Sequence, residues 1–316
     1  MWASRISQWI FTSFFPIVDQ HSELHFHEHF ITQSVQPFWE YEWRATDKLS
    51  VTAVVKLAYY GMYLNQYADN GKTVGSLGGA QFVTHTAGYD SWNPSIDACC
   101  HLRNNWLVYA QFGEGSVIPP SSVFDVKNAN VETLPKPALV KTYQTGTVLK
   151  FNRVTFDFDC YYIHFQNAYV EEPDAANGNV PVWYLPSPSN SEGVEAESSI
   201  YRGRVGLYLN GTVGSAKYQP TPLWADTPRD TETVGLTWQR KNWDTGFFEK
   251  HIGPMWNDNG SINQAVPIDP FNITDFFVNY TVRNASDLAG TKIHFAVSNV
   301  FNSHNIVGVI PASTDR

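Results

Sequence analysis

The sequence predicts an all-β protein, a partial antiparallel transmembrane β-barrel with short turns at one end and long loops at the other. About twelve segments alternate apolar and polar residues and pair as hairpins. Many span about 11 to 16 residues, whereas strands of soluble domains run about five or six and a tilted transmembrane strand needs about 9 to 11. Tight links alternate with long ones rich in Gly, Pro, Asn and Ser, which is typical of outer-membrane barrels.

The composition fits strands that have one apolar face and one wet face. Of the 316 residues, 43% are hydrophobic and 15% aromatic, while only 16% are charged. The mean hydropathy is −0.29, and no run of about 18 apolar residues exists, which excludes a helical membrane protein. A net charge of −9 argues against a nucleic-acid partner. The odd set Cys99, Cys100 and Cys160 argues against a disulfide framework.

Each predicted hairpin is two alternating segments joined by a short polar link. The first link is Thr46–Lys48, and the others lie near Arg103, Arg153, Arg202 and Asn242, with a last link at 285–287. The longer connections are rich in turn-forming residues and are predicted as loops at 62–92, 115–137, 171–190 and 259–269. The predicted hairpins are 36–45 with 49–61, 95–102 with 105–115, 138–152 with 154–170, 191–201 with 204–218, 229–241 with 246–258, and 271–284 with the segment that opens at 292.

The strands show one apolar face and one polar, sparsely charged face. In 229–241, Val234, Leu236 and Trp238 share one face, and a row of Thr and Gln residues occupies the other. A soluble sandwich gives the same alternation with its apolar face turned inward. Strand length and the rhythm of short and long links therefore favour the membrane barrel over the sandwich.

Five motifs in order resemble those of TonB-dependent outer-membrane receptors. KIHFAVSNVFNSHNIVGV (292–309) contains Asn299-Val300-Phe301-Asn302, similar to the Asn-Leu-Phe-Asn or Asn-Leu-Phe-Asp end of a late barrel strand in that family. SEGVEAESSI (191–200) resembles a Gly-Val-Glu-x-Glu strand, and the strand from Gly206 to Tyr218 follows it as in the family. The remaining matches are an aromatic-rich hairpin at 134–167 and strands at 227–239 and 268–284.

The resemblance implies the C-terminal part of a receptor barrel at 36–310, after a poorly defined segment at 1–35 and before a tail at 311–316. It implies location in the bacterial outer membrane, contact with its lipid, and TonB-dependent uptake of a small nutrient such as an iron chelate or saccharide. No plug, TonB box or final strand is recognised, so we expect TonB as a partner only if another segment supplies a plug. Enzyme activity and cofactors are not expected.

Two other functional hypotheses remain open at the level of sequence. One is a soluble carbohydrate-binding β-sandwich, which the 11 Trp residues favour. The other is a truncated receptor remnant without transport activity.

Few residues indicate chemistry. His25, His27 and His29 alternate within HSELHFHEH (21–29) and are candidate metal ligands, although we favour a polar loop without a metal. Asp157 and Asp159 are spaced like paired carboxylates, which occur in glycosidases. Their alternation with Phe156 and Phe158 instead favours a polar row that faces the lumen.

Overall fold

A computed structural model describes residues 6–11, 16–17, 23–24, 28–66, 84–119, 136–167, 170–174, 180–184, 188–218, 227–257, 266–283 and 288–306. Strands and the turns between them make up nearly all of this part of the chain. Among these residues there is no helix long and apolar enough to cross a bilayer.

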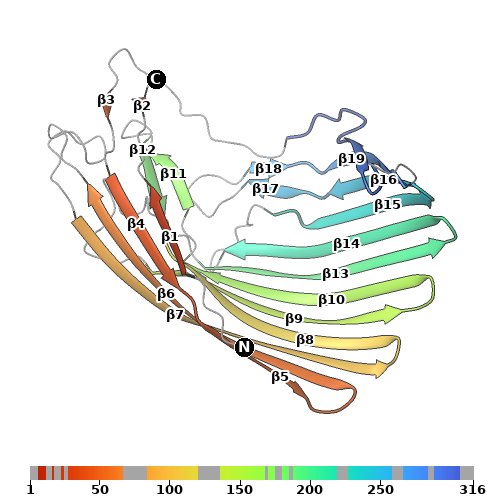
Figure 1. The fold of residues 1–316 in the computed structure, drawn as a ribbon. Coiled ribbons are helices and arrows are strands. Elements are labelled where there is room, and N and C mark those ends of the chain that lie inside the picture. The colour runs from red at the N-terminus through yellow and green to blue at the C-terminus, as the bar shows by residue number, and fades with distance from the viewer. Residues whose placement is uncertain are drawn as a thin grey trace.

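One antiparallel 14-stranded sheet forms the body of the molecule (Figure 1). Apart from β5, which pairs with β6 alone, its strands follow one another across the sheet in chain order. This up-and-down order confirms the predicted succession of hairpins. The strands are β1 (Ile6–Phe11), β4 (Glu28–Val35), β5 (Phe38–Arg44), β6 (Leu49–Gln66), β7 (Thr84–Arg103), β8 (Trp106–Val117), β9 (Ala138–Lys150), β10 (Val154–Gln166), β13 (Ser189–Arg202), β14 (Val205–Tyr218), β15 (Asp230–Arg240), β16 (Trp243–Ile252), β19 (Phe271–Thr281) and β20 (Lys292–Val297).

Short turns and long connections separate to opposite ends of the sheet, as the sequence predicts. The tight turns lie together on the right of Figure 1. Thr46 Oγ1 caps the first of them by accepting hydrogen bonds from the backbone N–H groups of Lys48 and Leu49, at 3.1 and 3.0 Å. Three small hairpins extend the opposite end. These are β2 (Pro16–Ile17) with β3 (Glu23–Leu24), β11 (Val170–Asp174) with β12 (Val180–Tyr184), and β17 (Met255–Asn257) with β18 (Val266–Ile268).

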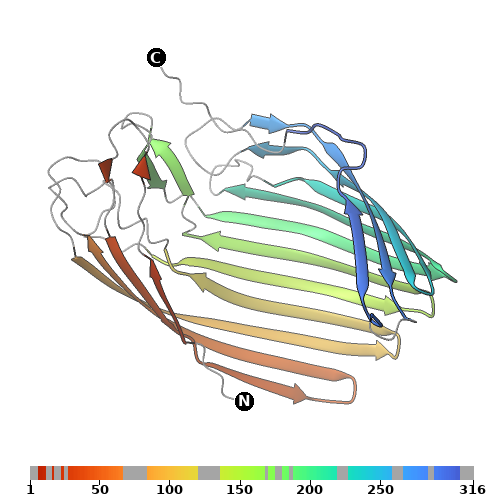
Figure 2. The ribbon, with the colours of Figure 1, turned by 45° about the horizontal axis from the view of Figure 1, so that its top comes forward.

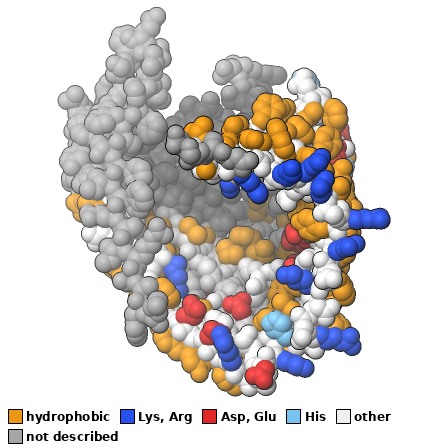
Figure 3. All heavy atoms as spheres, turned by 45° about the vertical axis from the view of Figure 1, so that its right-hand side comes forward, with side chains coloured by type: hydrophobic (Ala, Val, Ile, Leu, Met, Phe, Trp, Pro, Cys, Tyr) orange, Lys and Arg blue, Asp and Glu red, His pale blue; other side chains and the backbone are white. Residues whose placement is uncertain are grey.

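The sheet is curved into a trough, so it has an outer face and a lumenal face. Figure 2 shows the red N-terminal strands along one side of the trough and the blue C-terminal strands along the other. Within the described residues, β1 and β20 end the continuous run of strands, and β5 forms a further edge because it pairs with β6 alone. The space-filling view, turned toward the tight-turn end, shows the molecule hollowed at its centre (Figure 3).

The outer face is apolar and exposed. Trp92 is 67% exposed, Leu236 55% and Trp39 47%, and all three occupy outward positions in the register of the sheet. A soluble sandwich covers such a face with a second sheet. No second sheet of comparable size occurs in the described part of the chain. The exposed apolar face is the surface that a transmembrane barrel turns toward lipid.

Among the side chains that the structure describes, few apolar ones are buried, and a cluster of them lies near the long-loop end. Met255, Ile268 and Phe271 form a small cluster that joins the β17–β18 hairpin to β19, and Ile252 and Ile273 pack against it. This cluster packs the β17–β18 hairpin against the ends of β16 and β19.

Two strands are longer than predicted. The sequence indicated a loop at 62–92, but β6 continues to Gln66 and β7 begins at Thr84. Gly88, Asn93 and Pro94 caused the error because they are typical of loops. Pro94 pairs with Val55 of β6, but the pairing of β7 with β8 begins only at Ser95. At Pro94 the β7 strand therefore has a neighbour on one side only, as at a sheet edge, where proline is tolerated.

The sheet also begins earlier than predicted. No strand was predicted before residue 36, whereas β4 pairs with the second half of β6 and β1 pairs with β4. β4 and β5 lie in succession along the same neighbour, β6, and are separated at Gln36 and Pro37. The predicted link at 242–244 was also too long, because Trp243 opens β16 rather than belonging to the link.

Candidate functional site

Four carboxylates gather on the lumenal face of neighbouring strands. Asp157 and Asp159 on β10 lie directly opposite Glu197 and Glu195 on β13. Phe158, between the two aspartates, points to the outer face and is 37% exposed. The structure therefore agrees with the predicted lumen-facing row and adds a second acidic pair to it. Like charges directly opposite each other destabilise a sheet, so the arrangement is not explained by stability of the fold.

Two tyrosines extend this acidic patch on either side. The Tyr109 hydroxyl on β8 donates to Asp159 Oδ2 at 3.4 Å. The Tyr208 hydroxyl on β14 donates to Glu197 Oε2 at 2.9 Å. Each hydroxyl holds one carboxylate in place across the sheet. We call these six side chains the lumenal acidic patch: Tyr109, Asp157, Asp159, Glu195, Glu197 and Tyr208.

The patch is poorly compensated by the rest of the described structure. Asp159 is only 8% exposed, and Oδ1 of both Asp157 and Asp159 is buried without a hydrogen-bond partner. The ion pairs Arg44–Glu42, Lys141–Glu114 and His251–Asp230 lie outside the patch. A buried carboxylate that lacks partners costs free energy. The patch is therefore suited to bind a positively charged group that supplies the missing contacts.

Gly146 makes the patch possible by leaving space between strands. It lies on β9 between Tyr109 and Asp159, and pairs directly with both. A Cβ atom at this position would lie 2.6 Å from the Tyr109 ring and 2.7 Å from Asp159 Cβ. Only glycine lets the phenol lie flat across β9 and reach the carboxylate.

Gly146→Ala is expected to destabilise the chain by about 1–3 kcal/mol, because the added methyl displaces Tyr109 or Asp159. Gly115→Ala is the matched control, since a Cβ there meets nothing within 4 Å and its effect should stay within about 0.5 kcal/mol. Urea unfolding of both variants in lipid vesicles measures the difference. Equal unfolding midpoints would show that the close packing at Gly146 is not required.

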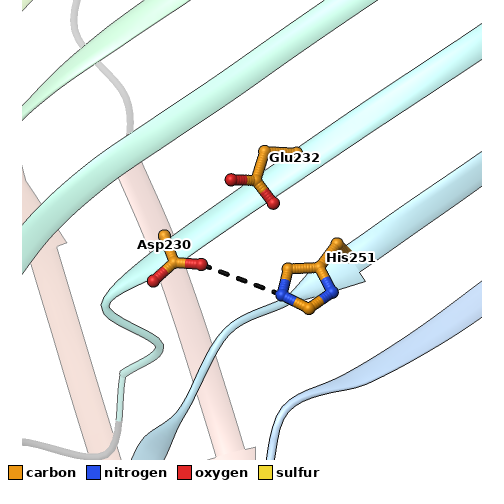
Figure 4. A group of neighbouring side chains, drawn as sticks. All are labelled: Asp230, Glu232 and His251. Carbon is orange, nitrogen blue, oxygen red and sulfur yellow. Dashed lines mark ion pairs between the residues drawn. The ribbon is translucent and has the colours of Figure 1, made fainter.

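A second group of polar side chains lies on the outer face near the long-loop end. Asp230 and Glu232 on β15 and His251 on β16 place their ligand atoms within 4.8 Å of one another (Figure 4). Among the described residues this is the one set of three acidic, His or Cys groups spaced to hold a metal ion. Sequence reasoning missed it, because the acids and the histidine come from different strands and only the register brings them together.

The predicted metal ligands cannot be placed in the same way. His25 and His27 lie outside the described residues, and His29 belongs to β4, where it pairs with Asn65. The metal reading of these three histidines stays a prediction.

The family model described as TonB dependent receptor-like, beta-barrel matches residues 11–300. Solved structures show the same fold. The ferric citrate transporter FecA in the unliganded form has 15% identity and a TM-score of 0.69, covering 91% of this chain and 43% of that chain. The copper transporter OprC has 13% identity and a TM-score of 0.69, covering 88% and 44%. The ferric yersiniabactin uptake receptor FyuA from Yersinia pestis has 14% identity and a TM-score of 0.64, covering 92% and 44%.

These similarities extend over most of this chain but over less than half the length of each of those proteins. No curated protein matches the sequence. At these identities the similarity shows a shared fold. The ligands named for those proteins are not thereby assigned to this chain.

Proposed function

The chain belongs to the TonB-dependent receptor-like β-barrel family, and from this premise we propose that it forms barrel wall in an outer-membrane receptor for a small nutrient. The observation that carries the proposal is the two-sided sheet. Its outer face exposes aromatic and aliphatic side chains, and its lumenal face holds the acidic patch. A membrane barrel needs an apolar exterior, and a polar interior suits a passage for a hydrophilic solute.

Within this proposal, the lumenal acidic patch binds a positively charged group by charge complementarity. The group comes from the nutrient or from a plug that another segment supplies. TonB is a partner only through such a plug. Iron chelates and saccharides are the nutrient classes that we propose, and binding and passage need no covalent catalysis.

The β-sandwich hypothesis has less support, because the apolar face that a sandwich would bury is exposed over many strands. The remnant hypothesis differs from ours in activity rather than in fold. Cell uptake therefore separates it from our proposal.

Deletion of the gene in its host is expected to reduce uptake of at least one nutrient, and re-expression of the full chain should restore it. The panel contains radiolabelled ferric chelates, Cu²⁺ and labelled oligosaccharides. Unchanged uptake of every member, with the protein present in the outer-membrane fraction of the parent strain, would favour the remnant. Recovery of the folded chain in the soluble fraction without detergent would contradict the membrane barrel itself.

A further inference from the structure

We propose that Asp230, Glu232 and His251 form a binding site for one divalent transition-metal ion of the zinc class, on the outer face of the sheet. The site is separate from the lumenal acidic patch and does not depend on nutrient uptake. It joins β15 to β16 where both strands reach the long-loop end of the barrel.

The register of the two strands brings the three side chains to one place. His251 lies directly opposite Glu232, and Asp230 is two residues before Glu232 on the same face. That face is the outer one, because it continues into Val234 and Leu236, which are 50% and 55% exposed. Figure 4 shows the Asp230 carboxylate and the His251 ring turned toward each other, with Glu232 beside them.

His251 is held in the orientation that a metal ligand needs. Its Nδ1 lies 2.6 Å from Asn272 Oδ1 on β19. An amide oxygen only accepts hydrogen bonds, so Nδ1 is the donor, and this tautomer of the neutral imidazole has its lone pair on Nε2. Metal-bound histidines are oriented by such a bond from their other ring nitrogen.

Among the described residues, no hydrogen bond reaches the opposite side of the His251 ring. Nε2 lies 3.9 Å from Asp230 Oδ2, which is too long for a hydrogen bond. His164, on the same outer face, differs because Asn190 and Gln166 occupy both of its ring nitrogens. Nε2 of His251 thus faces the Asp230 carboxylate across a gap.

The gap has the size for an ion. Zinc sits about 2.0–2.2 Å from nitrogen and oxygen ligands, so two ligands of one tetrahedral ion are roughly 3.4 Å apart. The 3.9 Å separation between Nε2 and Oδ2 and the 4.8 Å limit for the whole set are close to this value. Small side-chain rotations close the site.

Access and ligand chemistry define the kind of ion. The side chains of Asp230 and His251 are 30% and 37% exposed, so water can fill a remaining coordination position. One imidazole and two carboxylates suit Zn²⁺ or Co²⁺, whereas Mg²⁺ and Ca²⁺ prefer oxygen ligands alone. The bound ion would link β15 to β16 beside the long connections.

Gly253 offers a way to perturb the site while keeping all three ligands. Its backbone N–H donates to the Asp230 carbonyl oxygen at 2.8 Å. A Cβ atom at this position would lie 2.5 Å from Asp230 Cγ. Gly253→Ala must therefore move the Asp230 carboxylate.

The test is a titration of the full chain, folded in detergent, with Co²⁺ followed by visible absorption and displaced by Zn²⁺. The parent for the test carries Ser at 99, 100 and 160 and Gln at 25, 27 and 29, so that the thiols and the other candidate histidines cannot contribute. We expect one ion per chain. His251→Gln, Gly253→Ala and Asn272→Ala should each weaken binding about tenfold or more.

His164→Gln is the matched control and should bind like the parent. The β-sheet circular dichroism signal shows which variants are folded. If His251→Gln fails to fold, the metal affinities of Gly253→Ala and Asn272→Ala still test the site. Absence of Co²⁺ binding by the folded parent, or equal affinity in the parent and the folded variants, would overturn the site. Tighter binding of Mg²⁺ than of Zn²⁺ would overturn the assigned ion class.

Discussion

Leu236→Arg is expected to destabilise the chain in a bilayer by about 2–4 kcal/mol, the cost of a cationic side chain on the lipid face near the membrane centre. Leu236 lies in the middle of β15 on the outer face, with Val234 and Trp238 on either side. Its side chain is 55% exposed, so in water the same substitution would be nearly neutral. The free energy of urea unfolding in lipid vesicles measures the effect.

Thr237→Arg is the matched control because it lies on the same strand, one residue away, and faces the lumen opposite Gly206 and Gly246. A charge there remains in water, and its cost should be much smaller than that of Leu236→Arg. If both variants lost equal stability in vesicles, the assignment of the two faces would be wrong.

Neutralising part of the lumenal acidic patch is expected to raise the stability of the chain and to lower nutrient uptake. Asp159→Asn combined with Glu195→Gln preserves the shape of two directly opposed side chains and removes their repulsion. The free energy of unfolding should rise by about 0.2–1 kcal/mol. Uptake of the nutrient identified in the deletion experiment should nevertheless fall strongly. The patch would then offer a cationic group only two of its four negative charges.

The control for this pair is Glu192→Gln, which changes an exposed carboxylate on the same strand, opposite Tyr162, outside the patch. It should leave uptake unchanged. Loss of stability together with loss of uptake in the double variant would identify the patch as structural, and full uptake would remove it from the proposed function.

Much of the fold could be predicted because the apolar side chains of the outer face recur at every second residue of a strand. β15 is within one residue of its predicted limits at each end, since Val234, Leu236 and Trp238 mark the pattern clearly. β7 shows where this fails. Its first half contains Gly88 and Pro94 and has no apolar alternation, and it is a strand because β6 pairs with it. Tertiary pairing there overrides local preference.

The sites were less predictable than the strands because they depend on register. Alternation indicated that Asp157 and Asp159 share a face, but their position opposite Glu197 and Glu195 requires the alignment of β10 with β13. His251 and Asp230 are 21 residues apart in the numbering and meet only because the turn between β15 and β16 sets the pairing. Neither arrangement has a local sequence signal.

The central claim is that the sheet is a barrel wall with lipid outside and water inside. Single cysteines at positions 233, 234, 236, 237 and 238, in a chain whose three natural cysteines are replaced by Ser, test it most directly. Gly235 is kept, because a Cβ atom there would collide with the Phe248 ring. Membrane-impermeant thiol reagents should label positions 233 and 237 in lipid vesicles and spare 234, 236 and 238. Uniform labelling along the strand, or labelling of the Val234, Leu236 and Trp238 positions instead, would contradict the account.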